Sequence, residues 1–370
     1  MNRDPFKEYI KQAEPNMRDK GYAWQTAIGL QEVDGLKTSQ YLIDTAIKNI
    51  QGDITFDEAH ALLETYYEEN RKSDSKSRTE EADKVSFQIA KILSEKAFSF
   101  SSSELISIHK KLFMDIYEHA GKIRDYNITK KEWVLNGETV VYGSASELIN
   151  TINYDISEEK KFNYKGLSSN DIIKHLASFV SNLWQIHPFQ EGNTRTTAVF
   201  FIKYLRTLGY DVTNDIFAEN AWYFRNALVR ANYNDLKNGI HSTTEYLELF
   251  LENLLLGKNN TLQNRSLHIE NILNQKVDIE YKKVDIEDVK VDIEQLCRDR
   301  IPNITNKTIQ NILKIYNKYG FVQYFGRSDI VNLLELKPAM VSRLLKILLD
   351  NNIIEPIKGY GKGKYCFIPL

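Results

Sequence analysis

Cysteine is scarce in this sequence of 370 residues. The two that occur, Cys297 and Cys366, form no CxxC pair and lie near no group of histidines. This argues against both a disulfide framework and a structural zinc site. A chain with so few cysteines suits a reducing compartment, and we expect a cytoplasmic protein.

Long apolar runs are also missing. No stretch of about 18 uncharged apolar residues occurs, and the N-terminal residues lack the apolar core of a secretory signal. The sequence therefore predicts a soluble, unexported protein that does not associate with membranes.

A strong excess of positive charge is absent too. The net charge is -2 and the pI is near 6.4, which excludes a globally basic nucleic-acid coat but leaves room for a local basic patch. At 370 residues the chain exceeds the usual size of one domain, so we expect two or three.

Helical periodicity dominates what is present. Apolar residues recur at steps of three and four in four segments, 85–96, 105–117, 169–187 and 195–208, and Ser169 is the expected N-cap of the third. The exception is 126–142, where Asn136-Gly137 stands between β-forming residues. Asn-Gly tolerates the positive φ of a type I′ turn, so this segment predicts a β-hairpin.

The loop between the last two helices is rich in chemistry. It reads His-Pro-Phe-Gln-Glu-Gly-Asn-Thr-Arg over residues 187–195. His187, at the end of a helix, can accept a proton from an attacking hydroxyl near neutral pH. Glu191 offers a hard oxygen ligand for Mg²⁺, which commonly reaches a protein through one or two carboxylates and the phosphates of a nucleotide.

The second half of the loop is suited to phosphate. Gly192 and Asn193 permit a tight turn, and Thr194 is the expected cap of the next helix, whose free N–H groups attract anions. Arg195 adds a permanent charge with the fork geometry that phosphate oxygens accept. Base, metal ligand, phosphate cradle and cation thus occur within one short segment.

This segment resembles the signature of the Fic family, H-P-F-x-[D/E]-G-N-G-R-x-x-R, whose members typically carry AMP from ATP to Tyr, Thr or Ser of a target protein. The resemblance covers roughly residues 41–256. It implies that His187 is the catalytic base, that Glu191 positions Mg²⁺, and that Gly192, Asn193, Thr194 and Arg195 hold the α- and β-phosphates.

Two positions depart from the family pattern. Thr194 replaces the second glycine, which is tolerable if its φ stays negative. Ala198 replaces the last arginine, which the family pattern assigns to the γ-phosphate. The donor nucleotide therefore remains open, although ATP with Mg²⁺ is the first expectation.

The resemblance extends to other segments. The predicted hairpin is similar to the family's flap, which docks the target segment by strand-like pairing; its tip comprises Leu135, Asn136, Gly137 and Glu138. Tyr223 and Asn226 lie where relatives contact adenine and ribose, although aromatic residues at helical spacing also form cores.

A further pattern concerns regulation. Residues 65–70 fit [S/T]-x-x-x-E-[G/N], the pattern of the family's inhibitory helix. This implies that Glu69 could restrain the site, but the expected partner is Ala198, and so loose a pattern also arises by chance on an acidic helix.

The C-terminal part has its own pattern. Helices at 328–334 and 339–351 are joined by a proline-containing turn and followed by strands at 353–357 and 365–368 around a basic glycine-rich tip. This order resembles a winged helix-turn-helix. Ser342, Arg343 and Lys346 would then face DNA, although such modules also serve dimerisation or docking.

The predicted architecture is mainly α, a Fic helical fold with a small β-hairpin flap and a C-terminal winged helix. We divide the chain into an N-terminal helical region (1–100), a Fic catalytic domain (101–258), a helical connector with the Val-Asp-Ile-Glu repeat (259–300) and a winged helix-turn-helix (301–370).

The predicted function is protein adenylylation, on a hydroxyl of a target protein or of the chain itself. The alternatives are another phosphate-group transfer or AMP removal by the same loop, or a DNA-binding regulator whose Fic core senses a nucleotide. The target protein is an expected partner, and DNA and a second copy of the chain are further candidates.

Overall fold

The computed structural model describes residues 5–12, 15–70, 76–212, 215–271, 304–319, 325–356 and 364–368 and most of 293–301. The chain divides into two compact units, Met1–Leu273 and Asn274–Leu370. It is mainly helical, as predicted. No helix in the described ranges combines the length and apolar character needed to cross a bilayer.

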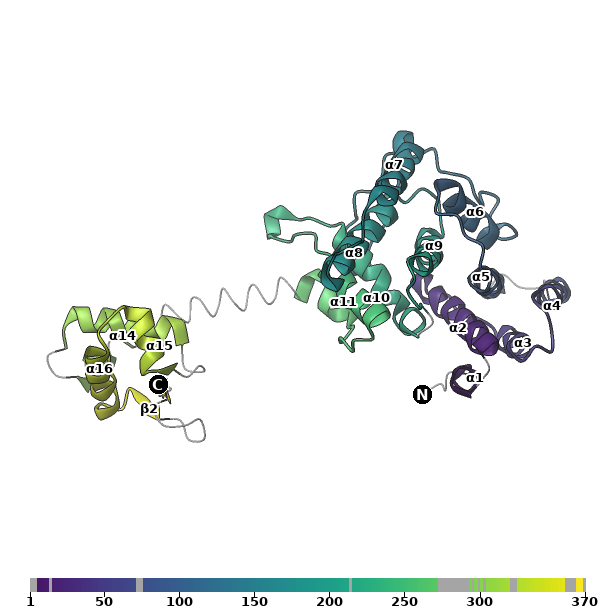
Figure 1. Ribbon diagram of the computed structural model, residues 1–370. Helices are drawn as coiled ribbons and strands as arrows, with labels where there is room; N and C mark the ends of the chain where they lie inside the picture. Colours follow the sequence, from purple (N-terminus) through teal and green to yellow (C-terminus); the bar gives the residue numbers. More distant parts are fainter. Residues whose placement is uncertain are drawn as a thin grey trace. The chain divides into compact units, whose positions relative to one another are not determined.

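The first unit consists of α-helices and short 3₁₀ turns (Figure 1). In chain order they are α1 (Lys7–Gln12), α2 (Pro15–Gly29), η1 (Leu30–Asp34), α3 (Gln40–Gln51), α4 (Phe56–Glu69), α5 (Lys76–Ser94), α6 (Ser102–Phe113), η2 (Trp133–Leu135), η3 (Ala145–Glu147), α7 (Leu148–Lys161), α8 (Ser169–Ile186), α9 (Asn193–Thr207), α10 (Ile216–Ala231), η4 (Leu236–Asn238), α11 (Glu245–Leu256) and α12 (Asn264–Leu267).

Helix α9 lies at the centre of this unit. Every residue from Asn193 to Leu205 is buried, and the helix contacts α5, α6, α8 and η1 (Figure 1). A helix covered on all sides cannot move without disturbing its neighbours. The N-terminus of α9, where the nine-residue motif ends, is therefore rigidly placed.

Helix α8 leads directly into His187, the first residue of the motif. Its apolar stripe, which includes Leu176, Val180 and Leu183, is buried, as the helical spacing predicted. The N-cap is Ser168, whose side chain accepts from the N–H of Asp171, one residue before the expected Ser169. The helix ends at His187, whose left-handed φ of 49° turns the chain into the motif loop.

The predicted β-hairpin between Tyr126 and Tyr142 is wrong in its strands. Trp133–Leu135 form the 3₁₀ turn η2, and no strand is assigned between residues 126 and 142. The Asn-Gly turn itself is correct, since Asn136 has φ 54° and Gly137 has φ 88°. Val134, Leu135 and Val140 are buried, so apolar contacts with the helices, rather than pairing between strands, hold this segment.

The second unit contains α14 (Asn306–Tyr319), β1 (Phe325–Gly326), α15 (Arg327–Leu334), α16 (Pro338–Asp350), β2 (Ile354–Pro356) and β3 (Lys364–Phe367). The strands form an antiparallel sheet in the order β1-β3-β2, with Glu355 opposite Cys366. The two helices and two strands expected here begin and end within two residues of their predicted positions. Most of the basic tip at 358–364 and most of the Val-Asp-Ile-Glu repeat lie outside the described residues.

Candidate active site

The candidate base, His187, is buried, with 3% of its surface exposed. Its Nδ1 lies 3.3 Å from the carbonyl oxygen of Trp184. Because a carbonyl only accepts, Nδ1 carries the proton and Nε2 keeps its lone pair. Burial, followed by the charge of Lys130, lowers the pKa of His187 well below 6.5. The ring is therefore neutral near pH 7, as a general base must be.

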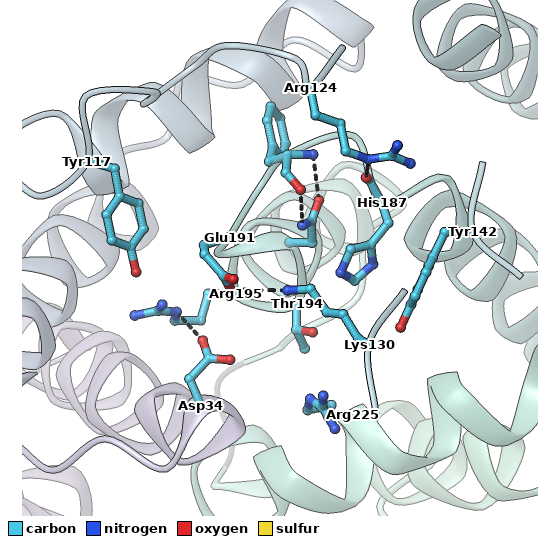
Figure 2. A network of polar contacts seen from close by, with 12 residues as sticks. Asp34, Tyr117, Arg124, Lys130, Tyr142, His187, Glu191, Thr194, Arg195 and Arg225 are labelled. Carbon is cyan, nitrogen blue, oxygen red and sulfur yellow. Dashed lines mark hydrogen bonds and ion pairs between the residues drawn. The ribbon is translucent and has the colours of Figure 1, made fainter. Parts of the chain in front are cut away.

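Arg124, which no motif in the sequence indicated, holds the backbone around this histidine. Its guanidinium donates to the carbonyl oxygens of His187 at 2.8 Å, Tyr126 at 2.5 Å and Gly143 at 2.6 Å. The backbone N–H of Arg124 donates to the carbonyl of Pro188. Figure 2 shows the bond to His187. One buried cation thus holds the left-handed turn in which His187 lies.

The motif loop closes on itself. Asn193 Nδ2 donates to the carbonyl of Phe189 at 2.7 Å, and the Phe189 N–H donates to Asn193 Oδ1 at 2.9 Å. Gly192 has φ 76°, and a Cβ on it would lie 2.3 Å from the Phe113 ring. Both the backbone angle and the space require glycine here. The side chain of Asn193 shapes the loop rather than facing a ligand.

His109, on α6, supports the loop from behind. The Gly121 N–H donates to its Nδ1 at 2.8 Å, so Nε2 carries the proton and donates to the carbonyl of Glu191 at 3.0 Å. The imidazole stacks on Phe189 at 3.7 Å. Burial lowers the pKa of His109 to about 4, which keeps both hydrogen bonds intact near neutral pH.

The candidate metal ligand, Glu191, is accessible. Its carboxylate is half exposed and lies 3.1 Å from Lys130 Nζ (Figure 2). No group of three or more His, Cys, Asp or Glu in the described ranges could hold a metal ion on its own. A lone carboxylate is nevertheless the protein donor that Mg²⁺ commonly uses when nucleotide phosphates and water supply its other ligands. The donor set fits a nucleotide-bound Mg²⁺.

The N-terminus of α9 forms the candidate phosphate cradle. Asn193 is the first helical residue and Gly192 is the N-cap, so the expected cap, Thr194, is wrong. The Thr194 hydroxyl instead accepts from Trp184 Nε1 at 3.0 Å, and its φ is not positive. Among the described contacts, no bond uses the N–H groups of Asn193, Thr194 or Arg195, which leaves them available to an anion.

Arg195 is engaged in a way that the sequence did not predict. Its Nη2 lies 2.7 Å from a carboxylate oxygen of Glu81, and its Nε lies 2.8 Å from one of Asp34 (Figure 2). The Nε–H is not aimed at Asp34, so that contact is an ion pair without hydrogen-bond geometry. Burial disfavours the charge, but the two carboxylates outweigh burial and raise the pKa of Arg195.

A cleft of about 1040 Å³ adjoins Asp34, the carboxylate that contacts Arg195. Its wall includes Asp34, Gly35, Tyr223, Arg225 and Asn264. Tyr223 contributes to the cleft wall, although only 2% of its surface is exposed, and its contact with a nucleotide stays a prediction.

Two predicted contacts lie elsewhere. Asn226 is fully buried, and its Nδ2 donates to Asn264. It therefore supports a residue of the cleft wall rather than reaching the cleft itself.

At the tip of the 126–142 segment, Leu135 is also fully buried, whereas Asn136, Gly137 and Glu138 are exposed. Of the four predicted tip residues, these three are the exposed ones.

Glu69 lies at the C-terminal end of α4, in an exposed groove lined by Tyr41, Ile54 and Tyr66. Among the described residues, no hydrogen bond or ion pair joins it to the motif, and Ala198 is fully buried. The carboxylates that do contact the motif cation are Asp34 and Glu81. Asp34 is the last residue of the 3₁₀ turn η1 and directly precedes Gly35, and this Asp-Gly pair was the signal available in the sequence.

Residues 99–205 match the model of the Fic/DOC family. This segment contains α6, the 126–142 segment, His187 and Arg195. The chain therefore carries a Fic/DOC family domain. Asp34 and Tyr223 lie outside the matched residues.

Curated relatives match over part of their length. The protein adenylyltransferase VbhT of Bartonella schoenbuchensis is 32% identical over 116 residues, which cover 31% of this chain and 23% of that protein. The probable protein adenylyltransferase y4lH of Sinorhizobium fredii is 29% identical over 134 residues, covering 35% and 64%. The chain thus spans less than two thirds of these relatives.

Solved structures are more distant. The N-terminal Fic domain of a putative cell filamentation protein from Bartonella quintana, with bound ADP, is 22% identical with a TM-score of 0.40, covering 50% of this chain and 86% of that one. A Fic domain containing signaling protein from Bacteroides thetaiotaomicron is 15% identical with a TM-score of 0.40, covering 70% and 97%.

Proposed function

We propose that this protein is a protein adenylyltransferase that moves AMP from Mg-ATP to a hydroxyl of a protein, with His187 as the base. The observation that carries the proposal is the neutral, buried imidazole of His187 in the same loop as Glu191 and the open N-terminus of α9. The relatives named as protein adenylyltransferases support it.

In the proposed reaction, Nε2 of His187 takes the proton of the target hydroxyl as its oxygen attacks the α-phosphorus. The new O–P bond forms in line with the breaking bond to the β-phosphate oxygen, and pyrophosphate leaves. The N–H groups of α9 stabilise the charge that develops on the α-phosphate oxygens. Positioning by the rigid loop and α9 supplies much of the rate.

Glu191 would hold Mg²⁺, which supplies charge neutralisation for the departing pyrophosphate. Its carboxylate is the exposed acidic group of the loop, and Lys130 is its present partner. The base and ribose of ATP would occupy the cleft beside Tyr223, whose volume is sufficient for a nucleotide.

Arg195 would hold phosphate only after Asp34 withdraws. Asp34 is in contact with the guanidinium and is 34% exposed, so it can leave toward solvent. Glu81 and the Gln31 side chain, which accepts from Arg195 at 3.1 Å, would remain as supports. We therefore propose Asp34, rather than Glu69, as the residue that restrains the site.

Labelled ATP tests the reaction. Incubation of the full chain with Mg²⁺, cell extract and ATP labelled at the α- or γ-phosphate should leave protein-bound label from the α position alone, and His187→Ala should abolish it. The same reaction without extract tests modification of the chain itself. Label from γ alone would indicate kinase chemistry, and no label from either would favour another donor, AMP removal or a nucleotide sensor.

We propose that the chain has the four parts expected from its sequence, with a winged helix at 301–370. We further propose DNA binding as a second function, carried by this C-terminal unit. Ser342, Arg343 and Lys346 are exposed on α16, opposite the buried face that includes Val341 and Leu345, which supports a helix that enters a groove.

Salt-dependent binding of the full chain to duplex DNA tests this second function. Arg343→Ala and Lys346→Ala should each weaken binding and reduce its salt dependence. Lys314→Ala, on the exposed face of α14, is the matched control. If no duplex binds even at low salt, the unit serves another purpose, such as association with a second copy of the chain.

A further inference from the structure

One buried carboxylate in the 126–142 segment has no role in the reaction as proposed. The side chain of Glu132 is fully buried, although Lys131 and Trp133 on either side of it are exposed. Removing a carboxylate from water costs several kcal/mol unless partners compensate it. The contacts of Glu132 are therefore informative.

Two side chains from different elements meet this carboxylate. Arg225, on α10, places Nη1 2.7 Å from Oε2, and the Tyr142 hydroxyl donates to Oε1 at 2.9 Å. Arg225 is itself only 15% exposed. Glu132 lies before the Asn-Gly turn, in the first limb of the segment, and Tyr142 lies after it, in the second limb. The ion pair and the hydrogen bond thus join both limbs to α10.

The backbone of Glu132 also closes the Asn-Gly turn. Its N–H donates to the carbonyl of Glu138, and its own carbonyl accepts from Leu135 and Gly137. In the absence of paired strands, Glu132 is the residue at which the turn and the helical core are fastened together.

Tyr142 carries this connection to the base. Its ring centroid lies 4.3 Å from that of His187, with the ring planes tilted by 42°, and Figure 2 shows the two side chains next to each other. The next residue, Gly143, donates its N–H to the carbonyl of Gln185, and Gln185 Nε2 donates to the carbonyl of Val141. The second limb is thus bonded to the last turn of α8, directly before His187.

We propose that Glu132 is a positioning residue that, through Tyr142 and with Arg225 as its counter-charge, holds the His187 imidazole in its reactive orientation. It touches neither nucleotide nor target. The proposal rests on the proposed function for its activity readout, but the geometry that it predicts can be measured without any reaction.

A double-mutant cycle separates this role from general destabilisation. Glu132→Gln keeps an acceptor for Tyr142 but leaves Arg225 without its counter-charge, and Arg225→Met leaves Glu132 buried and unpaired. The double variant replaces the ion pair by neutral groups of similar volume, which restores charge balance. Glu158→Gln, in an exposed pair with Lys161, is the matched control.

In AMP transfer by the full chain, each single variant should lose about tenfold to a hundredfold in kcat. The change in KM for ATP should be smaller than this in Glu132→Gln, whereas Arg225→Met should also raise KM because Arg225 lines the cleft. The double variant should recover most of the lost kcat. Tyr142→Phe should show a smaller decrease in kcat than the single variants, and Glu158→Gln should have the kcat of the wild type. Equal kcat in Glu132→Gln and wild type, or a double variant whose loss is the product of the two single losses, would overturn the proposal.

The imidazole NMR signals of His187 give the second readout. They should shift in Glu132→Gln and Arg225→Met, return toward wild type in the double variant, and stay unchanged in Glu158→Gln, because they report the ring of Tyr142. If the wild type transfers no AMP but the variants show these shifts, only the proposed function is refuted. Unshifted signals in folded Glu132→Gln would refute the positioning role alone.

Discussion

At the scale of single residues, the site depends on charges that are buried and individually compensated. His187 is neutral because burial and neighbouring cations disfavour its protonated form. Arg195 is charged because Asp34 and Glu81 overcome its burial. Each state has a measurable consequence.

The pH dependence of transfer follows from His187. A base acts only while unprotonated, and the pKa of His187 lies well below 6.5. We expect kcat/KM to stay level from about pH 8 down to about pH 6 and to fall only in more acid solution. A loss centred near 6.5 would mean that His187 titrates as an exposed histidine or that another group is the base.

Substitution of Asp34 tests the restraint on Arg195. Asp34→Asn removes the negative charge while keeping the shape, so AMP transfer should rise by about tenfold, equivalent to ~1.4 kcal/mol. The melting temperature should fall slightly, because Arg195 loses a counter-charge. Glu69→Gln, which changes a carboxylate outside that cleft, should leave the rate unchanged. A rise in Glu69→Gln alone would restore the original expectation.

At the scale of elements, the motif is a rigid junction between α8 and α9. Two left-handed residues, His187 and Gly192, delimit the loop, and Asn193 closes it through Phe189. The loop has little freedom to adapt to a side chain at position 192.

Two glycines that flank α9 provide a matched test of this rigidity. Gly192 and Gly209 both have positive φ, but a Cβ at 192 would meet Phe113 at 2.3 Å, whereas one at 209 meets nothing within 4 Å. Gly209→Ala should cost about 1 kcal/mol in the free energy of unfolding. Gly192→Ala should cost about 2 kcal/mol or more. Chemical denaturation measures both, and equal losses would show that the loop yields to the added methyl group.

At the scale of the whole molecule, the chain forms two units with separate cores. One core includes Trp24, Trp184 and Phe200, and the other includes Ile312, Phe325 and Phe367. All residues of the candidate active site belong to the first unit. The second unit supplies none of them.

Truncation tests this independence. A fragment of residues 1–273 should fold and transfer AMP at a rate within about twofold of the full chain, because additivity holds for sites without shared partners. His187→Ala in the same fragment is the control for activity. A fragment that unfolds, or that loses most of its activity, would show that the C-terminal unit supports the site.

The sequence by itself determined the local features, because they depend on neighbouring residues. The spacing of apolar residues predicted α8 and α9, and the proline-containing turn between two helical segments predicted α15 and α16. The chemistry of residues 187–195 predicted one loop that could carry a base, a metal ligand and a phosphate site. Asn136-Gly137 predicted a turn with positive φ, since that preference belongs to the two residues themselves.

Tertiary structure alone decided what depends on distant contacts. Whether the residues beside the Asn-Gly turn pair as strands depended on the helices that bury Val134 and Leu135. The partners of Arg195 and His187 come from positions as remote as Asp34, Arg124 and Tyr142, and no spacing in the sequence encodes such meetings. The motif therefore predicts the chemistry, whereas the fold decides which carboxylates contact Arg195 and which residues pack around His187.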